Sequence, residues 1–242
     1  MFLPHLRAGW SGDAPPAFDT FDLIAAVTAE EDGSNTFATI NSNALTWDEG
    51  DLLLAFASGN HGNTTRNGVI PSPNSWTPGS ESWTKHFDDR GIVGTQAASF
   101  NCYTTTALSD ETAKTAALGF SGTMFALLVA LMRVPRSTII RQVSPVAKVE
   151  STGTSITATF GAAVLETSQI VSFVSQRNGT TNFGVPTNFT EVLAQNIGTA
   201  HRAVVAARIG HAGTTVETTG MSSGDNAKLA VAIELARAGQ EL

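Results

Sequence analysis

The residues of this sequence best suited to chemistry are its histidines and its clustered carboxylates. The histidines are His5, His61, His86, His201 and His211. None of them forms a close ligand pair such as HxH or HExxH, so no local motif indicates a zinc site or a metalloprotease. A Ser–His–Asp triad would need residues brought together from distant parts of the chain. We therefore predict no catalytic residues, no metal site and no cofactor.

Carboxylates gather at three places that look like strand ends. They are Asp48-Glu49-Gly50-Asp51, Asp88-Asp89 and Asp110-Glu111. A glycosidase needs two carboxyls about 5 to 9.5 Å apart across a cleft, whereas acidic turn residues at strand ends are the ordinary alternative. The loop Trp47–Asp51 also offers oxygen ligands that suit calcium, although it lacks the spacing of an EF-hand loop. We interpret all three clusters as turns and keep the calcium site as an alternative.

Two polar loops provide the predicted binding surface. Residues 59–73 form a long, amide-rich segment, and residues 177–186 have a similar composition. Trp76 and Trp83 flank a further turn, where aromatic side chains suit sugar stacking or a protein interface. For Trp76 we predict a core position, because Phe189 stands at the corresponding place later in the chain, and Trp83 is left open. The predicted surface residues are His61, Asn63, Arg66, Trp83, Arg177 and Asn178.

The composition limits the class of protein that positions these residues. The chain has 242 residues, 42% of them hydrophobic, which is enough for a large core. Its net charge of −7 argues against nucleic acid binding, which needs clustered Lys and Arg. The single cysteine, Cys102, excludes an intrachain disulfide, and its setting indicates a buried position. The N-terminus lacks the pattern of a signal peptide, so we expect synthesis in a cytoplasm without export by that route.

The most apolar stretch is Gly119–Val134, and a weaker version of it recurs at Met221–Arg237. Its apolar part, Met124–Met132, is much shorter than the ~20 residues that a membrane-spanning helix needs, so we predict no membrane insertion. Gly122, Pro135 and the Thr-rich sequence before it favour a strand buried on both faces. Leu52–Phe56 and Phe125–Leu131 are predicted at sheet centres. Phe100–Thr106 and Thr154–Phe160 alternate and are predicted to be half exposed.

The two halves of the chain follow the same order of motifs, which predicts an internal duplication. Asp51–Ser58 aligns with Gln169–Gln176 at an offset of 118 residues, and Pro73–Thr77 aligns with Pro186–Thr190. Short strands separated by Gly, Asn, Thr and Pro turns are typical of an antiparallel sandwich or barrel. The predicted fold is therefore all-β: a duplicated, jelly-roll-like antiparallel β-sandwich with about six strands per repeat and an N-terminal arm.

The predicted division of the chain follows from this alignment. Residues 1–20 form the arm, 21–134 the first repeat, 135–152 a crossover and 153–242 the second repeat, whether packed as one domain or two. Within the crossover, Thr138–Val143 is a candidate edge strand, and Leu108–Lys114 is either a single helical turn or a loop. The arm carries apolar side chains without a regular period, which suggests docking on a partner or back onto its own domain. The predicted docking residues are Phe2, Leu3, Leu6 and Trp10.

The motifs follow a repeated order: Leu-Leu-Leu-Ala-Phe, then Pro-x-x-Trp-Thr, then an alternating Tyr/Thr strand, then Ser-Gly before an apolar strand. This order resembles that of virion proteins of tailed bacteriophages and gene transfer agents. The resemblance covers residues 33–237 and implies tandem β-sandwich units of a minor tail, fibre or head-surface protein. It implies a non-enzymatic structural or adhesive role in the virion, other virion proteins as partners, and a homo-oligomer with a trimer favoured. The alternatives are a jelly-roll protein that binds or cleaves host-surface glycan, and a capsid cement protein.

Overall fold

The structure, a computed structural model, describes residues 23–31, 37–62, 65–73, 82–150, 152–177, 183–198, 201–211, 213–224 and 226–239. Every regular element in these ranges is a β-strand, which confirms the predicted all-β class. The predicted arm, residues 1–20, lies outside the described residues. Within the described part of the chain, no helix has the length and hydropathy needed to span a membrane.

The first half of the chain builds a five-stranded antiparallel main sheet. Its strands, in spatial order, are β1 (Ile24–Glu31), β10 (Ala126–Val134), β4 (Leu52–Gly62), β7 (Gln96–Thr106) and β6 (Thr84–Val93). The predicted centre strand, which begins at Leu52, lies in the middle of this sheet. The β10 strand pairs with β4 along its whole length, from Ala126 opposite Asn60 to Val134 opposite Leu52.

The second half builds a second main sheet with the same strand order. Its strands are β11 (Thr138–Val143), β18 (Lys228–Arg237), β14 (Gln169–Arg177), β16 (His201–Ile209) and β15 (Thr190–Ile197), and β12 (Ala147–Val149) also pairs with β18. The predicted edge strand Thr138–Val143 is confirmed as β11. Residues 135–152 therefore supply two strands to the second sheet. The matching order supports the internal duplication, which stays a prediction.

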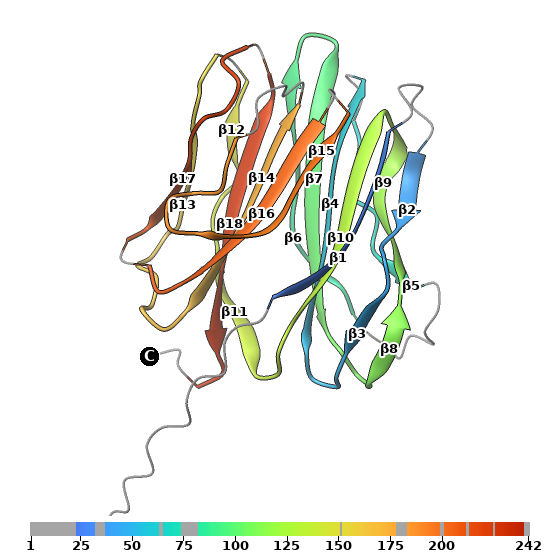
Figure 1. Ribbon diagram of the computed structural model, residues 1–242, viewed down its shortest axis with the longest axis vertical. Coiled ribbons are helices and arrows are strands. Elements are labelled where there is room, and N and C mark those ends of the chain that lie inside the picture. Colours follow the sequence, from blue (N-terminus) through green and yellow to red (C-terminus); the bar gives the residue numbers. More distant parts are fainter. Residues whose placement is uncertain are drawn as a thin grey trace, which may run out of the picture.

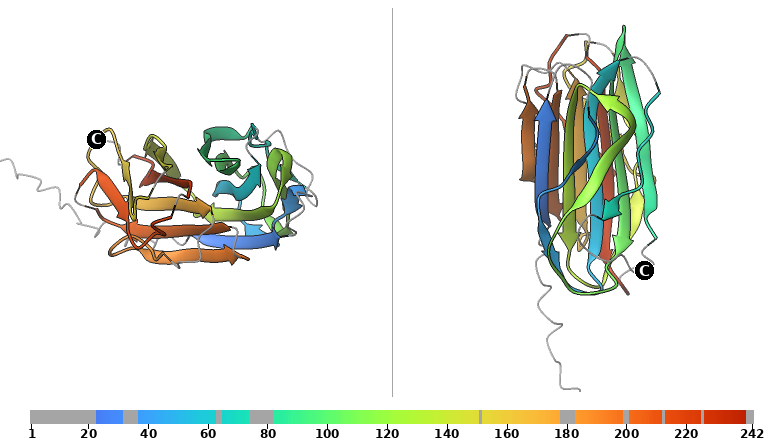
Figure 2. Two further views of the ribbon diagram at one scale, coloured as in Figure 1. Left: turned by 90° about the horizontal axis from the view of Figure 1, so that it is seen from above. Right: turned by 90° about the vertical axis from the view of Figure 1, so that its right-hand side faces the viewer.

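Smaller sheets cover the outer face of each main sheet (Figure 1). The first main sheet is covered by β2 (Phe37–Asn41), β9 (Ala116–Met124) and β5 (Ser72–Pro73), and by β3 (Leu45–Trp47) with β8 (Glu111–Lys114). The second is covered by β13 (Ile156–Thr159) with β17 (Thr215–Thr218). In Figure 1 these layers follow one another from left to right, and the left view of Figure 2 shows the same stacking from above.

The two main sheets face each other across one apolar core, which we call the central core. It contains Leu54, Phe56 and Leu128 from the first sheet, and Phe173, Val205 and Val231 from the second. The Phe56 and Phe173 rings meet with their centroids 5.0 Å apart. Because each main sheet also packs against an outer layer, β4, β14 and β18 are buried on both faces. The two halves therefore share one core, and the fold is a single sandwich in which two main sheets lie between outer layers of smaller sheets.

Several local predictions need correction. The apolar stretch 119–134 forms two strands, because the chain passes from the outer sheet (β9) to the main sheet (β10) at Phe125. Ser121 and Gly122 thus lie inside β9. The strand Phe100–Thr106 is buried up to Thr105, because β9 covers the face that the alternation marked as exposed. Residues 111–114 form β8. In the described part of the chain, the predicted first repeat contains ten strands, β1 to β10, whereas the predicted second repeat contains six, β13 to β18.

The alignment of the two halves also shifts by one residue. Phe56 contacts Phe173, and the hydroxyls of Ser58 and Ser175 lie 2.9 Å apart, so these positions correspond at an offset of 117. The sequence alignment at 118 pairs Phe56 with Val174, which faces the outer layer. In a strand, a shift of one residue moves every side chain to the opposite face. Strands buried on both faces carry no alternation that would have revealed the error.

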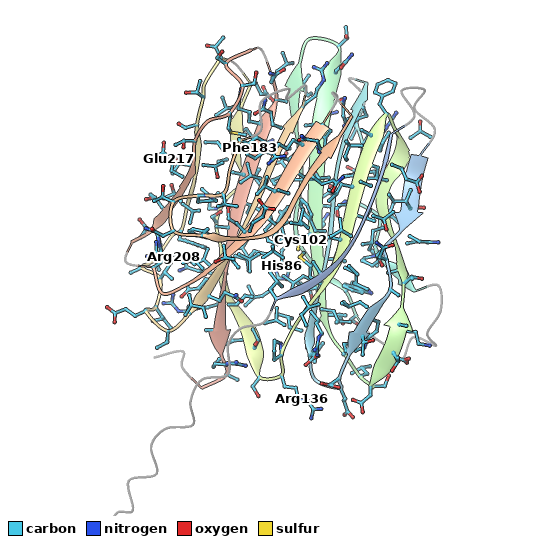
Figure 3. All side chains as sticks on the ribbon, viewed as in Figure 1. His86, Cys102, Arg136, Phe183, Arg208 and Glu217 are labelled. Carbon is cyan, nitrogen blue, oxygen red and sulfur yellow. The ribbon has the colours of Figure 1, made fainter. Side chains whose placement is uncertain are left out.

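The sandwich has two ends with different roles. At the end we call the base, β1 begins at Ile24, opposite Arg133, and β4 begins beside it at Leu52. The described chain also finishes there, after Arg237, and Arg136 marks this end in Figure 3. At the other end, the tip, β4 stops at Gly62, β14 stops at Arg177 and β18 begins at Lys228. The 11 residues of β4 separate the ends by about 34 Å.

Candidate binding surface and buried polar groups

The structure divides the predicted surface residues between the two ends. His61, Arg66 and Arg177 lie at the tip, where β4 and β14 end. Trp83 precedes β6, whose first residue pairs with Thr104 towards the base, and its half-buried ring packs against the outer core of the first sheet. Asn63, Asn178 and Trp76 lie outside the described residues, as do Phe2, Leu3, Leu6 and Trp10. Trp83 and the tip residues therefore do not form one site.

His61 is a buried strand residue, which corrects its assignment to a surface loop. Its side chain has an exposed fraction of 0%, and its Nε2 lies 2.7 Å from Ser99 Oγ. Nδ1 lies 2.5 Å from the carbonyl oxygen of Gly62, which can only accept, so Nδ1 carries the proton. Burial lowers the pKa of His61 to about 4, and the nearby Arg66 and Arg90 act in the same direction. The imidazole is therefore neutral near pH 7.

His201 joins the two main sheets through a pair of serines. Its Nε2 lies 2.7 Å from Ser58 Oγ on the facing sheet and 3.4 Å from Ser175 Oγ on its own sheet. Burial lowers the pKa of His201 to about 3, and a charge on His61 would lower it further. All three side chains have an exposed fraction of 0%. A substrate cannot reach the Ser58 hydroxyl, so this Ser–His contact acts as polar packing in the central core.

The sequence reasoning overlooked one motif with a chemical meaning. Gly220-Met221-Ser222-Ser223-Gly224 matches the Gly-x-Ser-x-Gly pattern of a nucleophile elbow. Such an elbow stands between a strand and a helix, whereas these residues connect β17 to β18. The Ser222 hydroxyl accepts a hydrogen bond from Asn226 Nδ2 at 3.1 Å, and no histidine contact is found for it among the described residues. The local geometry therefore differs from that of a hydrolase.

The tip of the second sheet carries a polar row that sequence reasoning missed. Asn196, Arg202, Gln176 and Lys228 lie side by side across β15, β16, β14 and β18. The Arg202 guanidinium donates to the carbonyl oxygen of Phe183 and lies 5.1 Å from its ring centroid. Gln176 Oε1 accepts a hydrogen bond from Ser222 N. These contacts hold the chain segments around Phe183 and Ser222 against the second main sheet at the tip.

Arg177 and Arg66 are also held by the fold. Arg177 ends β14 with 6% of its surface exposed, so it too is a buried strand residue and not a loop residue. Burial lowers the pKa of its guanidinium. Arg66 is half buried, its Nε bonds to the carbonyl oxygen of Thr123 at 3.3 Å, and its side chain lies directly over Gly122. A Cβ at Gly122 would lie 2.7 Å from Arg66 Nε, so a larger residue there would displace the Arg66 side chain.

The acidic clusters are tied into ion pairs and hydrogen bonds, and Asp88-Asp89 lies inside β6, which corrects its interpretation as a turn. Asp51 is buried and lies 2.8 Å from Arg133 Nη1, while Asp48 lies 3.7 Å from the same nitrogen. The Asp51 carboxylate, which the calcium alternative required as a ligand, is therefore paired with the Arg133 guanidinium. Among the described residues, no group of three or more His, Cys, Asp or Glu side chains is placed to hold a metal ion. Asp110 accepts a hydrogen bond from Glu49 N, which is a turn contact.

Glu234 is the most deeply buried acid among the residues that the structure describes, and it ties the crossover to the second sheet. Its carboxylate is fully buried and accepts hydrogen bonds from Arg141, Gln142 and the backbone of Leu165. Burial raises the pKa of Glu234, but these hydrogen bonds, with one from Ser168, outweigh burial and lower it.

Replacing Glu234 with Ala is expected to lower the free energy of unfolding by about 3 kcal/mol, because the backbone and guanidinium donors lose their acceptor. Urea denaturation near pH 7 measures this loss. Glu217→Ala is the matched control, since Glu217 is exposed on β17 and should change stability by less than about 0.5 kcal/mol. Equal effects of the two substitutions would contradict the role of Glu234.

Comparisons with known proteins found no relative. No protein-family model matches the chain, no curated protein matches it, and no solved structure matches it.

Proposed function

We propose that this chain is a non-enzymatic structural protein of a tailed-bacteriophage or gene-transfer-agent particle. In this proposal the N-terminal arm attaches the protein to other virion proteins, and the tip points outward for adhesion or assembly. Support comes from the separation of the two ends. The described chain begins at Leu23 at the base, about 34 Å from the tip, where β4 and β14 lead into the polar loops.

The fold suits a particle component that must resist mechanical and chemical stress. Two main sheets share one core and each has a covered outer face, so the central strands are closed to solvent on both sides. The single cysteine, Cys102, is buried and free, so no intrachain disulfide contributes to the stability of the protein. A low charged fraction of 14% fits a surface that neighbouring subunits cover in part.

Deleting residues 1–20 is expected to leave a folded protein that no longer joins particles. The deleted residues precede β1, so the sheets and the central core keep all their strands. Loss of several apolar anchors, each worth more than about 1 kcal/mol, should lower occupancy by at least about tenfold. Occupancy is measured by mass spectrometry of purified particles, and circular dichroism checks the fold. A full-length variant with Phe2, Leu3, Leu6 and Trp10 changed to Ser should reproduce the loss, and full occupancy of the truncated protein would contradict the proposal.

The glycan-binding alternative predicts a different result. A jelly-roll lectin or glycosidase would bind or cleave polysaccharide through the tip loops without any particle. Trp83 lies near the base and packs against the outer core of the first sheet, which counts against its use as a sugar-stacking platform beside the tip loops. Glycan-array binding or hydrolysis by the isolated protein, lost on truncation of the 59–73 loop, would favour the alternative over the proposed virion role.

A further inference from the structure

A groove of about 860 Å³ opens at the base, between the first strand of one main sheet and the edge of the other. Leu23, Ile24 and Ala25 form one wall, and Val192 and Ile209 belong to the other. The two walls come from β1 and from β15 with β16. Figure 1 shows β1 and β15 in front of the sandwich, and the left view of Figure 2 shows them side by side.

The groove is an unfinished margin of the central core. Leu23, Ala25 and Val192 pack against that core but remain partly exposed. Four large hydrophobic side chains are exposed among the residues that the structure describes: Ile24, Ile70, Leu108 and Ile209. Ile24 and Ile209, with 43% and 52% of their surfaces exposed, both line this groove. Gathering of exposed apolar groups in one hollow is typical of a binding surface.

Two sheet edges meet at the groove and lie against each other over part of their length. The β1 strand stands at one end of its sheet and β15 stands at one end of the other. On the opposite side of the sandwich, Glu150 accepts a hydrogen bond from Ile92 N, and Lys148 pairs with Asp89, which closes that margin. Sheet-edge backbone beside exposed apolar side chains suits contact with an added peptide segment.

The chain itself supplies such a segment at this place. Residues 1–22 end where Leu23 enters the groove wall, and they contain Phe2, Leu3, Leu6, Trp10, Phe18 and Phe21. Twenty-two residues span up to about 70 Å when extended, which exceeds the length of the sandwich. A short tether gives the segment an effective concentration on the order of millimolar at the groove. A free partner would have to compete with that concentration.

We propose that in the free protein this groove binds the chain's own N-terminal segment, residues 1–22. Its apolar side chains cover Ile24 and Ile209 and complete the margin of the central core. The inference stands apart from the proposed function, and it gives the same docking residues a resting position when no particle is present.

Disulfide trapping tests the proposal directly. Cys102 is fully buried and burial raises the pKa of its thiol, so it stays unreactive while engineered cysteines are oxidised. Ile209→Cys is combined in turn with Phe2→Cys, Leu3→Cys, Leu6→Cys and Trp10→Cys. The control set combines the same four changes with Ile70→Cys, because Ile70 is 61% exposed on the outer face of the other half. Mild oxidation of dilute full-length protein is followed by non-reducing electrophoresis and peptide mass spectrometry.

At least one Ile209→Cys pair is expected to form an intrachain disulfide about tenfold faster than its Ile70→Cys control, at a rate independent of protein concentration. Cross-linked dimers that increase with concentration would show that a second copy occupies the groove and would overturn the proposal. Rates equal to the controls for all four pairs would also overturn it. Particle incorporation of the oxidised and reduced forms is a separate measurement: equal incorporation would contradict the docking role of the arm and leave the groove assignment standing.

Discussion

Replacing Leu128 with Asp is expected to unfold both halves of the protein together. Leu128 lies on β10, is fully buried in the central core, and faces the second main sheet. An unpaired charge at such a site costs several kcal/mol, which is comparable to the 5–15 kcal/mol that stabilises typical domains. Because the two main sheets share this core, the loss of packing extends to the second sheet as well as the first.

A milder substitution measures the coupling between the halves. Leu128→Ala should cost about 2–5 kcal/mol by leaving a cavity in the central core, so the protein stays folded. Amide hydrogen exchange is then followed in β4 and β7 of the first sheet and in β14 and β16 of the second. Protection should fall by similar amounts in both sheets. A fall confined to the first sheet would mean that the halves unfold independently, and Leu108→Ala, at an exposed site, provides the control.

Lowering the pH from 7.5 to 5 is expected to reduce the free energy of unfolding by about 4 kcal/mol. Burial holds the pKa of His61 at about 4 and that of His201 at about 3, below the value of 6.5 for an exposed histidine. A group with a lowered pKa in the folded state stabilises the fold above its unfolded pKa, and this contribution is lost as the pH falls below about 6.5. The contribution of each histidine to the free energy of unfolding therefore falls by about 2 kcal/mol between pH 7.5 and 5.

Denaturation curves at several pH values test this expectation. The double variant His61→Gln/His201→Gln removes both titrating groups and should flatten the profile between pH 7.5 and 5. Burial also lowers the pKa of His86, which leaves a smaller residual slope of the same sign. Glu234 has a lowered pKa, so its contribution is lost only towards pH 4 and below. His211→Gln is the control, and an unchanged slope in the double variant would contradict the assignment.

The candidate site was only partly predictable from the sequence. The 59–73 and 177–186 segments do begin at one end of the fold, because the motifs before them form equivalent central strands. Burial of His61 and Arg177 was not visible, since the strands β4 and β14 continue two or more residues further than the apolar run suggests. Trp83 went to the opposite end because the strand after it, β6, runs antiparallel to β7.

Local sequence determined the class of fold and the positions of the main strands. Apolar runs such as Leu52–Phe56, bounded by turn residues, favour buried strands, and the repeated motifs indicated two similar sheets. The pairing of the two faces was decided only in the tertiary structure. A strand buried on both sides gives no alternation, so the sequence could not tell that Phe56 and Ser58 face Phe173 and Ser175. The contact of His201 with Ser58 joins residues far apart in the chain, and it exists only because the two sheets share one core.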